Sequence, residues 1–250
     1  MSEYDNPHDR PSAVLQRLAQ DDPWVMYLVV RRERLGTLDE TLVAGAVASV
    51  DCVDRWREAP AWRDAFDAWL SRSFRKVCLR ASERDWAKLS AYDRGVGRVA
   101  GEPAVIALPP RTKSQRDKLL VHLQAFTTAD FAPPAPAPAE AFAMRFARND
   151  ALAMSAGKAV AQIAHAALHA CGAFGAERAE DFARWRALGM PCAVRRAHGD
   201  AWEALKREER VAVVRDAGLT EVAPGSETFL AMAPSAPERW SATWRALPGV

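Results

Sequence analysis

The stretch M-S-A-G-K-A-V-A-Q-I-A-H-A-A-L-H-A-C, residues 154–171, predicts a helix that is apolar on nearly every side. Ser155 is a suitable N-cap, and no proline interrupts the residues that follow it. At ~100° per residue, the polar side chains of this helix fall within a sector of roughly 60°. These side chains are Lys158, Gln162, His165 and His169. We therefore expect a buried helix whose narrow polar stripe faces a cleft.

Lys158 occupies the third position of this helix, beside the positive end of the helix dipole, where a cation is unfavourable. A lysine is explained there if an anion or a carboxylate lies close to it. The alternative is a surface lysine whose long stem reaches water. The helix by itself does not decide between these two interpretations.

Length and composition indicate a globular protein. The chain has 250 residues, 49% of them hydrophobic and 26% charged, enough for one large domain or two smaller ones. The formal net charge of +2 excludes a polybasic nucleic-acid binder but not a local basic surface. The cysteines Cys52, Cys78, Cys171 and Cys192 show no C-x-x-C spacing, which favours reduced thiols and a cytoplasmic location. We expect neither a signal peptide nor a transmembrane segment.

Both halves of the chain predict one order of elements: strand, helix, helix, strand, helix, strand, strand, helix. In the first half these are residues 24–30, 38–50, 61–71, 76–80, 82–89, 97–100, 103–108 and 112–126. In the second half they are residues 141–147, 155–171, 176–188, 192–195, 200–207, 210–215, 226–233 and 235–247. A structural duplication explains the repeated order, with chance agreement of two coarse patterns as the alternative.

A Pro/Ala-rich segment at residues 132–140 predicts a linker, the alternative being a surface loop inside one domain. We expect a polar tail at 1–22, an accessory α/β domain at 23–131 and a second α/β domain at 141–250. The closing helices, 112–126 and 235–247, are leucine-rich or aromatic and suit packing between the two domains.

A second informative stretch runs over residues 211–230, where an apolar strand ends abruptly on Arg215-Asp216. The following loop carries Thr220, and the next strand leaves with Ser226 and Thr228 on one face. Polar groups at a strand end are where sites form in α/β proteins. The alternative is that Asp216 and Thr220 only satisfy backbone donors in a tight loop.

Together, the two stretches resemble the archaeal and eukaryotic-type peptidyl-tRNA hydrolase family, often called type 2. The pattern is G-K-x-x-x-Q-x-x-H-A, followed some 50 residues later by R-D-A-G-x-T-x-x-x-P-G-S/T-x-T. The matching residues are Gly157, Lys158, Gln162, His165, Ala166, Arg215, Asp216, Ala217, Gly218, Thr220, Pro224, Gly225, Ser226 and Thr228. The resemblance covers roughly residues 141–250.

The resemblance implies an α/β fold, a mixed four-stranded sheet with helices on both faces, and we expect two such domains in tandem. It implies cleavage of the ester that joins a peptide to the 3′ end of tRNA, through contacts with the CCA end and acceptor stem. The catalytic group would be Lys158, Asp216 and Thr220, with Gln162, His165, Ser226 and Thr228 lining the site. No metal or cofactor is implied.

The residue types fit ester hydrolysis, which needs an activated water and a group that stabilises an oxyanion. Asp216 can orient or deprotonate water, and Lys158 can bind the oxyanion or hold Asp216 ionised. The threonine hydroxyls can position water or the ribose. A Ser226–His165–Asp216 triad is an alternative that no feature of the sequence supports.

Phosphate contacts are expected from basic residues near the site: Arg195, Arg196, Lys206, Arg207 and Arg210. The last three equally fit a solvated helix end.

The first half lacks the Lys/Gln/His stripe and the D-A-G-x-T loop, so we expect it to be non-catalytic. It can add stability, or affinity for tRNA through Arg72, Arg75, Lys76 and Arg80. Two other functions stay open, a non-catalytic RNA- or protein-binding module and a hydrolase of another aminoacyl-tRNA ester.

Overall fold

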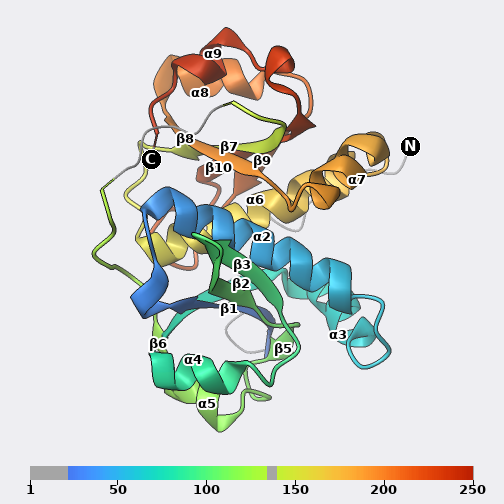
Figure 1. Cartoon of the computed structure of the whole chain (residues 1–250), viewed down its shortest axis with the longest axis vertical. Coiled ribbons are helices and arrows are strands. Elements are labelled where there is room, and N and C mark those ends of the chain that lie inside the picture. Colours follow the sequence, from blue (N-terminus) through green and yellow to red (C-terminus); the bar gives the residue numbers. More distant parts are fainter. Residues whose placement is uncertain (1–21, 134–139, 250) are drawn as a thin grey trace.

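The computed structural model describes residues 22–133 and 140–249, which we call the N-terminal half and the C-terminal half. Figure 1 shows two sheets stacked with a pair of helices between them and further helices outside each sheet. The predicted tail, apart from its last residue Asp22, and most of the predicted linker lie outside the described residues.

The C-terminal half contains a four-stranded mixed sheet in the order β8-β7-β10-β9. Its strands are β7 (Ala143–Asn149), β8 (Cys192–Ala197), β9 (Val211–Arg215) and β10 (Glu227–Ser235). β7 pairs with β8 in parallel and with β10 antiparallel, and β10 pairs with β9 antiparallel. The expected sheet of this half is therefore confirmed, with β8 and β9 at its opposite edges.

The N-terminal half contains a six-stranded sheet in which the order β3-β4-β1-β2-β6 forms the main path and β5 pairs with β1. Its strands are β1 (Trp24–Arg31), β2 (Arg75–Ala81), β3 (Gly95–Val99), β4 (Glu102–Ala107), β5 (Arg111–Thr112) and β6 (Gln124–Ala125). β1 pairs with β2 in parallel and with β4 antiparallel, as β7 does with β8 and β10. The first four strands of each half therefore share one topology, as the repeated order of elements predicts.

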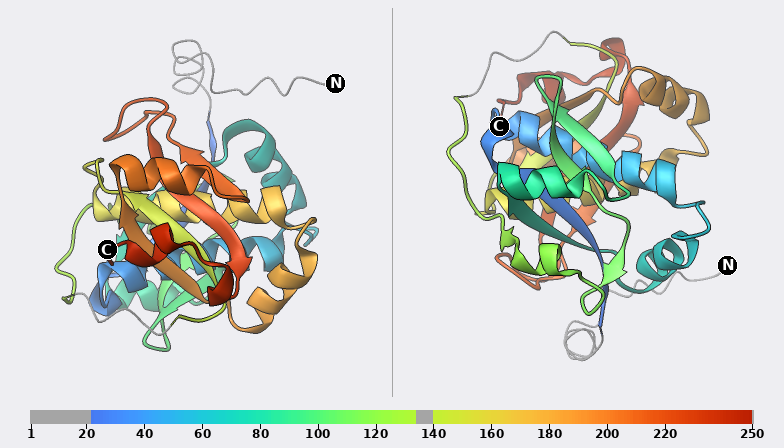
Figure 2. Two further views of the ribbon diagram at one scale, coloured as in Figure 1. Left: turned by 90° about the horizontal axis from the view of Figure 1, so that it is seen from above. Right: turned by 60° about the horizontal axis from the view of Figure 1, so that its bottom comes forward.

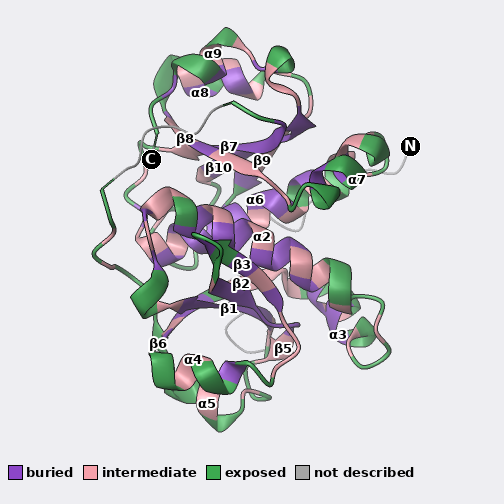
Figure 3. Ribbon diagram, viewed as in Figure 1, coloured by how far each residue is buried: buried purple, intermediate pink, exposed green. Residues whose placement is uncertain are grey.

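Two long helices, α2 (Leu38–Trp56) and α6 (Ala156–Phe174), lie between the two sheets, and many of their residues are coloured purple, as buried, in Figure 3. They approach closely at Gly45, where an added Cβ would lie 2.7 Å from Cγ1 of Val160. One hydrophobic core runs through both halves here, from Met26 and Leu42 to Val160 and Phe229. This position explains why α6 is apolar on nearly every side.

The expectation that the closing helices pack the halves together is wrong, because α2 and α6 do so. Outside the N-terminal sheet, α4 (Glu83–Leu89) and α5 (Lys118–His122) cover a separate small core. Outside the C-terminal sheet, α8 (Gly199–Lys206) and α9 (Ala242–Ala246) cover another, as Figure 2 shows from above. The remaining helical segments are η1 (Arg32–Arg34), α3 (Arg63–Ala68), η2 (Trp69–Ser73), α7 (Ala179–Ala187) and η3 (Pro237–Arg239).

Two predicted helices are much shorter in the structure. In the expected helix 112–126, Asp117 caps a new start by accepting a hydrogen bond from the Leu120 N–H, and Gln124 is already extended beside β2. In the expected helix 235–247, Ser235 still belongs to β10 and Ser241 caps the start of α9. A capping side chain inside each predicted helix therefore marks the true start.

No helix among the described residues is both long enough and apolar enough to span a bilayer.

Candidate active site

Lys158 is fixed at the start of α6, at the interface between the halves. The Ser155 hydroxyl caps the helix by accepting a hydrogen bond from the Lys158 N–H at 3.1 Å. At Gly157 the N-terminal half comes so close that an added Cβ would lie 1.6 Å from the carbonyl oxygen of Phe126. Glycine is therefore required beside the lysine for steric reasons.

Lys158 and Asp216 form a nearly buried ion pair. The Lys158 Nζ lies 2.6 Å from Oδ2 of Asp216, and the two side chains are 9% and 7% exposed. The same Nζ donates to the Thr220 hydroxyl at 3.2 Å. Of the two interpretations of Lys158, the one with a nearby carboxylate is therefore the one observed, and that carboxylate is Asp216, which follows β9 directly.

Gln162, one turn further along α6, links the ion pair to the sheet. Its Nε2 donates to Oδ2 of Asp216 at 2.6 Å, and its Oε1 accepts from the Thr228 hydroxyl at 2.7 Å. Thr228 is fully buried on β10. Its side chain therefore orients Gln162 and is closed off from solvent.

The loop after β9 holds the Asp216 carboxylate from the other side. Its Oδ1 accepts from the Gly218 N–H at 2.8 Å, so both carboxylate oxygens already have donors. Gly218 has a φ of +72°, and an added Cβ would lie 2.4 Å from Pro224. The loop reaches this tight geometry only with glycine at that position.

Glu221 is a site residue that sequence reasoning missed. Its carboxylate accepts from the Ser155 N–H at 2.7 Å and from the Ser155 hydroxyl at 2.8 Å, which ties the loop to the start of α6. An acidic group is favourable at a helix N-terminus. The sequence does place the Glu221 carboxylate in the same loop as Thr220, but the neighbouring residues do not indicate which helix that carboxylate contacts.

His165 and His169 point to the N-terminal half. Nδ1 of His165 lies 3.0 Å from Nζ of Lys76 on β2, and both imidazole rings make edge contacts with Phe74. The side-chain partners of Asp216 are Lys158 and Gln162, and among the described residues no hydrogen bond joins Asp216 to His165. The alternative Ser226–His165–Asp216 triad is therefore not assembled.

The structure does not bring Arg195 or Arg210 to this cluster. Arg195 lies on β8, at the opposite edge of the sheet from β9, and donates to the carbonyl oxygens of Arg245 and Leu247. Arg210 precedes β9 at the end far from Asp216 and pairs with Glu177 and Glu209. Ser226 is adjacent only through its backbone, where its carbonyl accepts from the Asp216 N–H at 2.9 Å.

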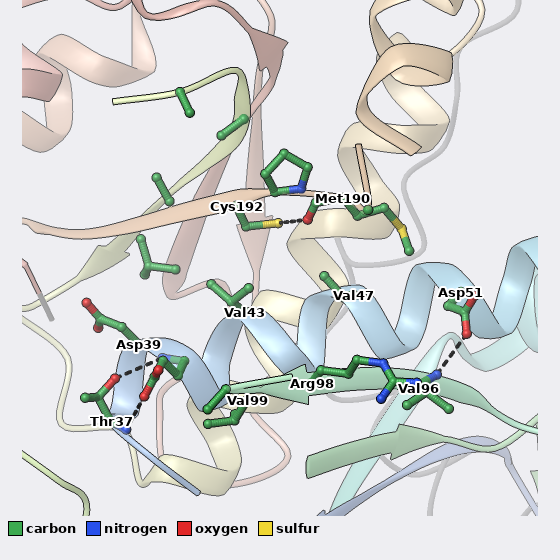
Figure 4. Close-up of a pocket in the computed structure, with 18 of the residues that line it drawn as sticks. Thr37, Asp39, Val43, Val47, Asp51, Val96, Arg98, Val99, Met190 and Cys192 are labelled. Carbon is green, nitrogen blue, oxygen red and sulfur yellow. Dashed lines mark hydrogen bonds between the residues drawn. The ribbon is translucent and has the colours of Figure 1, made fainter. Parts of the chain in front are cut away.

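A cavity of about 1460 Å³ lies against α2, β3 and the start of β8 (Figure 4). Val43, Val47, Val96, Val99 and Met190 are among the residues that line it.

Because α2 and β3 are the counterparts of α6 and β9, this cavity adjoins the position equivalent to the Lys158 cluster. Glu40 stands there in place of the lysine, and β3 ends in the turn Ala100-Gly101 rather than in an aspartate. The cavity therefore lacks the lysine–aspartate pair.

Comparison with known proteins bears on this cluster directly. The family model for peptidyl-tRNA hydrolase PTH2 matches residues 142–248. A peptidyl-tRNA hydrolase of Thermococcus onnurineus (strain NA1) is 38% identical over 93 residues, which are 35% of this chain and 78% of that protein. The chain belongs to the peptidyl-tRNA hydrolase PTH2 family.

A second relative, the peptidyl-tRNA hydrolase of Staphylothermus marinus (strain ATCC 43588 / DSM 3639 / JCM 9404 / F1), is 36% identical over 87 residues. These residues make up 32% of this chain and 72% of that protein. Membership of the PTH2 family identifies the chain as a hydrolase. The matched segment contains Lys158, Gln162, Asp216, Thr220 and Thr228, whereas the whole N-terminal half lies outside it.

Proposed function

We propose that the chain hydrolyses the ester between a peptide, or an N-blocked amino acid, and the 3′ end of tRNA, and so recycles tRNA in translation. The observation that carries this function is the 2.6 Å contact between Lys158 and Asp216 at the start of α6, inside the PTH2 segment. The names of both relatives support the same substrate.

Lys158 is the donor that stabilises the oxyanion. Its ammonium carries three N–H groups, of which one faces Asp216 and one faces Thr220. The third has no partner within the described ranges and is available to the carbonyl oxygen of the ester. A preorganised donor of this kind contributes ~10²–10³-fold to turnover.

Asp216 positions the lysine. Its two oxygens accept from Lys158, Gln162 and the Gly218 N–H, so its carboxylate holds the ammonium in place. The hydrogen bonds from Thr228 to Gln162 and from Gln162 to Asp216 hold the carboxylate in this position.

Thr220 positions the attacking water. It is exposed, and its hydroxyl oxygen accepts one hydrogen bond from Lys158, which leaves a lone pair for a water proton. The water oxygen forms the new bond to the ester carbon, and the bond from that carbon to the ribose oxygen breaks. A proton from the water passes to the 3′ oxygen of tRNA, which leaves as a free hydroxyl.

The proposed tRNA contacts, the domain that carries catalysis and the cellular location follow from this substrate. The site takes the CCA end, and basic side chains outside the cluster, Arg195 and Arg210 among them, meet the acceptor stem. We assign catalysis to a domain at 141–250, joined by a linker at 132–140 to an accessory domain at 23–131 that follows a tail at 1–22. A translation enzyme of this kind acts in the cytoplasm.

The test is to incubate the full chain with N-acetyl-aminoacyl-tRNA and, separately, with aminoacyl-tRNA whose amine is free. Free tRNA is measured on acid gels against a buffer control. We expect release from the blocked substrate. Release of tRNA from the unblocked substrate alone would mean that the protein hydrolyses a different aminoacyl-tRNA ester. Release from neither substrate would favour a non-catalytic RNA-binding module.

A further inference from the structure

Lys76 of the N-terminal half reaches the catalytic helix of the C-terminal half. Its Nζ lies 3.0 Å from Nδ1 of His165. His165 shares the polar stripe of α6 with Lys158, and it lies about 10 Å along the helix axis from that lysine at ~1.5 Å per residue. The N-terminal half therefore places an amine beside the stripe that carries the Lys158 cluster.

The surroundings of Lys76 supply no counter-charge. Its Nζ lies 4.0 Å from the ring centre of Phe74 and 4.8 Å from that of Trp69. Within residues 22–133 and 140–249, no carboxylate pairs with this amine and its hydrogen-bond partner is His165, so two of its three N–H donors have only aromatic rings beside them and no acceptor. Burial lowers the pKa of Lys76 well below its usual value. An anion bound beside Lys76 would accept hydrogen bonds from these two donors and would supply the missing counter-charge.

The backbone before Lys76 is strained in a way that builds these surroundings. The π-helical turn η2 (Trp69–Ser73) ends at Phe74, which has a φ of 47°. A bulky residue rarely adopts this left-handed conformation, and it persists where the surrounding structure requires it. Here it sets the Phe74 ring 5.0 Å from the ring of His165 and 5.4 Å from that of His169.

We propose that Lys76, held by His165, forms an anion subsite that binds a backbone phosphate of the 3′-terminal nucleotides of tRNA. The proposal rests on the proposed function, because it places the ester at Lys158 and the adjoining nucleotides along the stripe. The backbone phosphates are the anions of such a substrate. Lys76 is then a substrate-positioning residue, contributed by a half of the chain that lies outside the PTH2 match.

The experiment compares the full chain with its Lys76→Met variant on two substrates. One is N-acetyl-aminoacyl-tRNA, and the other is the N-acetyl-aminoacyl ester of adenosine, which has no phosphate. Methionine keeps much of the side-chain volume and removes the charge. Lys118→Met is the matched control, because Lys118 is exposed at the start of α5.

On the tRNA substrate, we expect Lys76→Met to raise KM roughly tenfold or more, as loss of a charge-assisted contact does, with kcat changed less than about twofold. The slope of log KM against log salt should fall by about one, the signature of one lost phosphate contact. On the adenosine ester the variant should match the parent chain. Lys118→Met should leave both the KM and the slope unchanged.

An unchanged KM and salt slope on tRNA would overturn the proposal, and so would an equal loss on the adenosine ester, which would make Lys76 a packing residue. If Lys76→Met does not fold, Lys76→Gln takes its place in the same comparison. If the parent chain hydrolyses neither substrate, the proposed function fails on its own. The subsite is then judged by anisotropy with uncharged tRNA, where Lys76→Met should still weaken Kd roughly tenfold.

Discussion

Glu40 and Lys158 occupy the same position in the two halves, the third residue of α2 and of α6, after the caps Thr37 and Ser155. The Glu40 carboxylate turns back and accepts a hydrogen bond from the Thr37 N–H at 2.8 Å, which completes a capping box. Lys158 instead reaches forward to Asp216. Glu40 thus caps the start of its own helix, whereas Lys158 links the start of α6 to the end of β9.

This difference predicts that Glu40 contributes to stability alone. Glu40→Ala should lower the free energy of unfolding by about 0.3–1.5 kcal/mol, the usual contribution of one element of a helix cap, and leave turnover within about twofold. Urea denaturation and kcat measured on the same preparation check both parts. A large drop in turnover with unchanged stability would place Glu40 in the site and contradict the comparison of the two halves.

The two threonines of the site should behave differently. Thr228→Val leaves the Gln162 carbonyl without its buried donor and should cost about 1–3 kcal/mol of unfolding free energy. Thr220→Val removes an exposed hydroxyl and should change stability by less than about 0.5 kcal/mol while lowering kcat at least about tenfold. Each variant is the control of the other, and a Thr220→Val enzyme with normal turnover would remove Thr220 from the mechanism.

Acid should lower the stability of the protein through protonation of Glu227, which lies on β10 and pairs with Arg215 at the end of β9. Burial opposes its ionisation, but hydrogen bonds from Lys206 and Trp202 and the charges of Lys206 and Arg215 bring the pKa of Glu227 below its usual value of 4.5. The unfolded chain then binds the proton more readily, so this stabilisation is present above about pH 4.5 and is lost as pH falls through the folded pKa.

Melting temperatures between pH 7 and pH 3 test this linkage. The Glu227→Gln variant should lose less stability on acidification than the parent chain, because it has no carboxylate to protonate. Glu180→Gln, at an exposed position of α7, should retain the slope of the parent chain. Parallel curves for the parent chain and Glu227→Gln would contradict the argument.

Separating the two halves should lower the stability of the C-terminal half more than its hydrolytic activity. A fragment of residues 139–250 exposes the face of α6 that packs on α2, Val160 included, and should bind apolar dyes and aggregate more readily. It should retain some hydrolysis, and a fragment of residues 1–131 should have none. Hydrolysis by a folded 1–131 fragment would contradict the assignment of the site to the C-terminal half.

The stripe on α6 and the loop after β9 were predictable because each has a local pattern. Helical spacing puts Lys158 and Gln162 on one face, and the strand that ends at Arg215 leaves Asp216 at its mouth. The unfavourable place of Lys158 at a helix N-terminus allowed either a nearby carboxylate or a surface lysine, and Asp216 at 2.6 Å decides for the carboxylate. The family resemblance joined two stretches that no local rule connects.

The other features depend on contacts between distant segments. Arg195 lies away from the site because the strand order sets β8 at the far edge from β9, and Arg210 lies at the end of β9 far from Asp216. The pairing of Lys76 with His165 joins residues from different halves, so neither stretch alone indicates it. The closing helices were mispredicted because each observed helix begins only after a cap inside the predicted range, Asp117 for α5 and Ser241 for α9.

The most direct test of the account is the single-turnover rate of N-acetyl-aminoacyl-tRNA hydrolysis by the full chain and by its Lys158→Met and Asp216→Asn variants. The account predicts hydrolysis by the parent chain and a loss of at least ~10²-fold in each variant, with circular dichroism showing that both remain folded. A folded Lys158→Met variant with a rate within a few-fold of the parent chain would contradict the central claim that this lysine–aspartate pair carries the reaction.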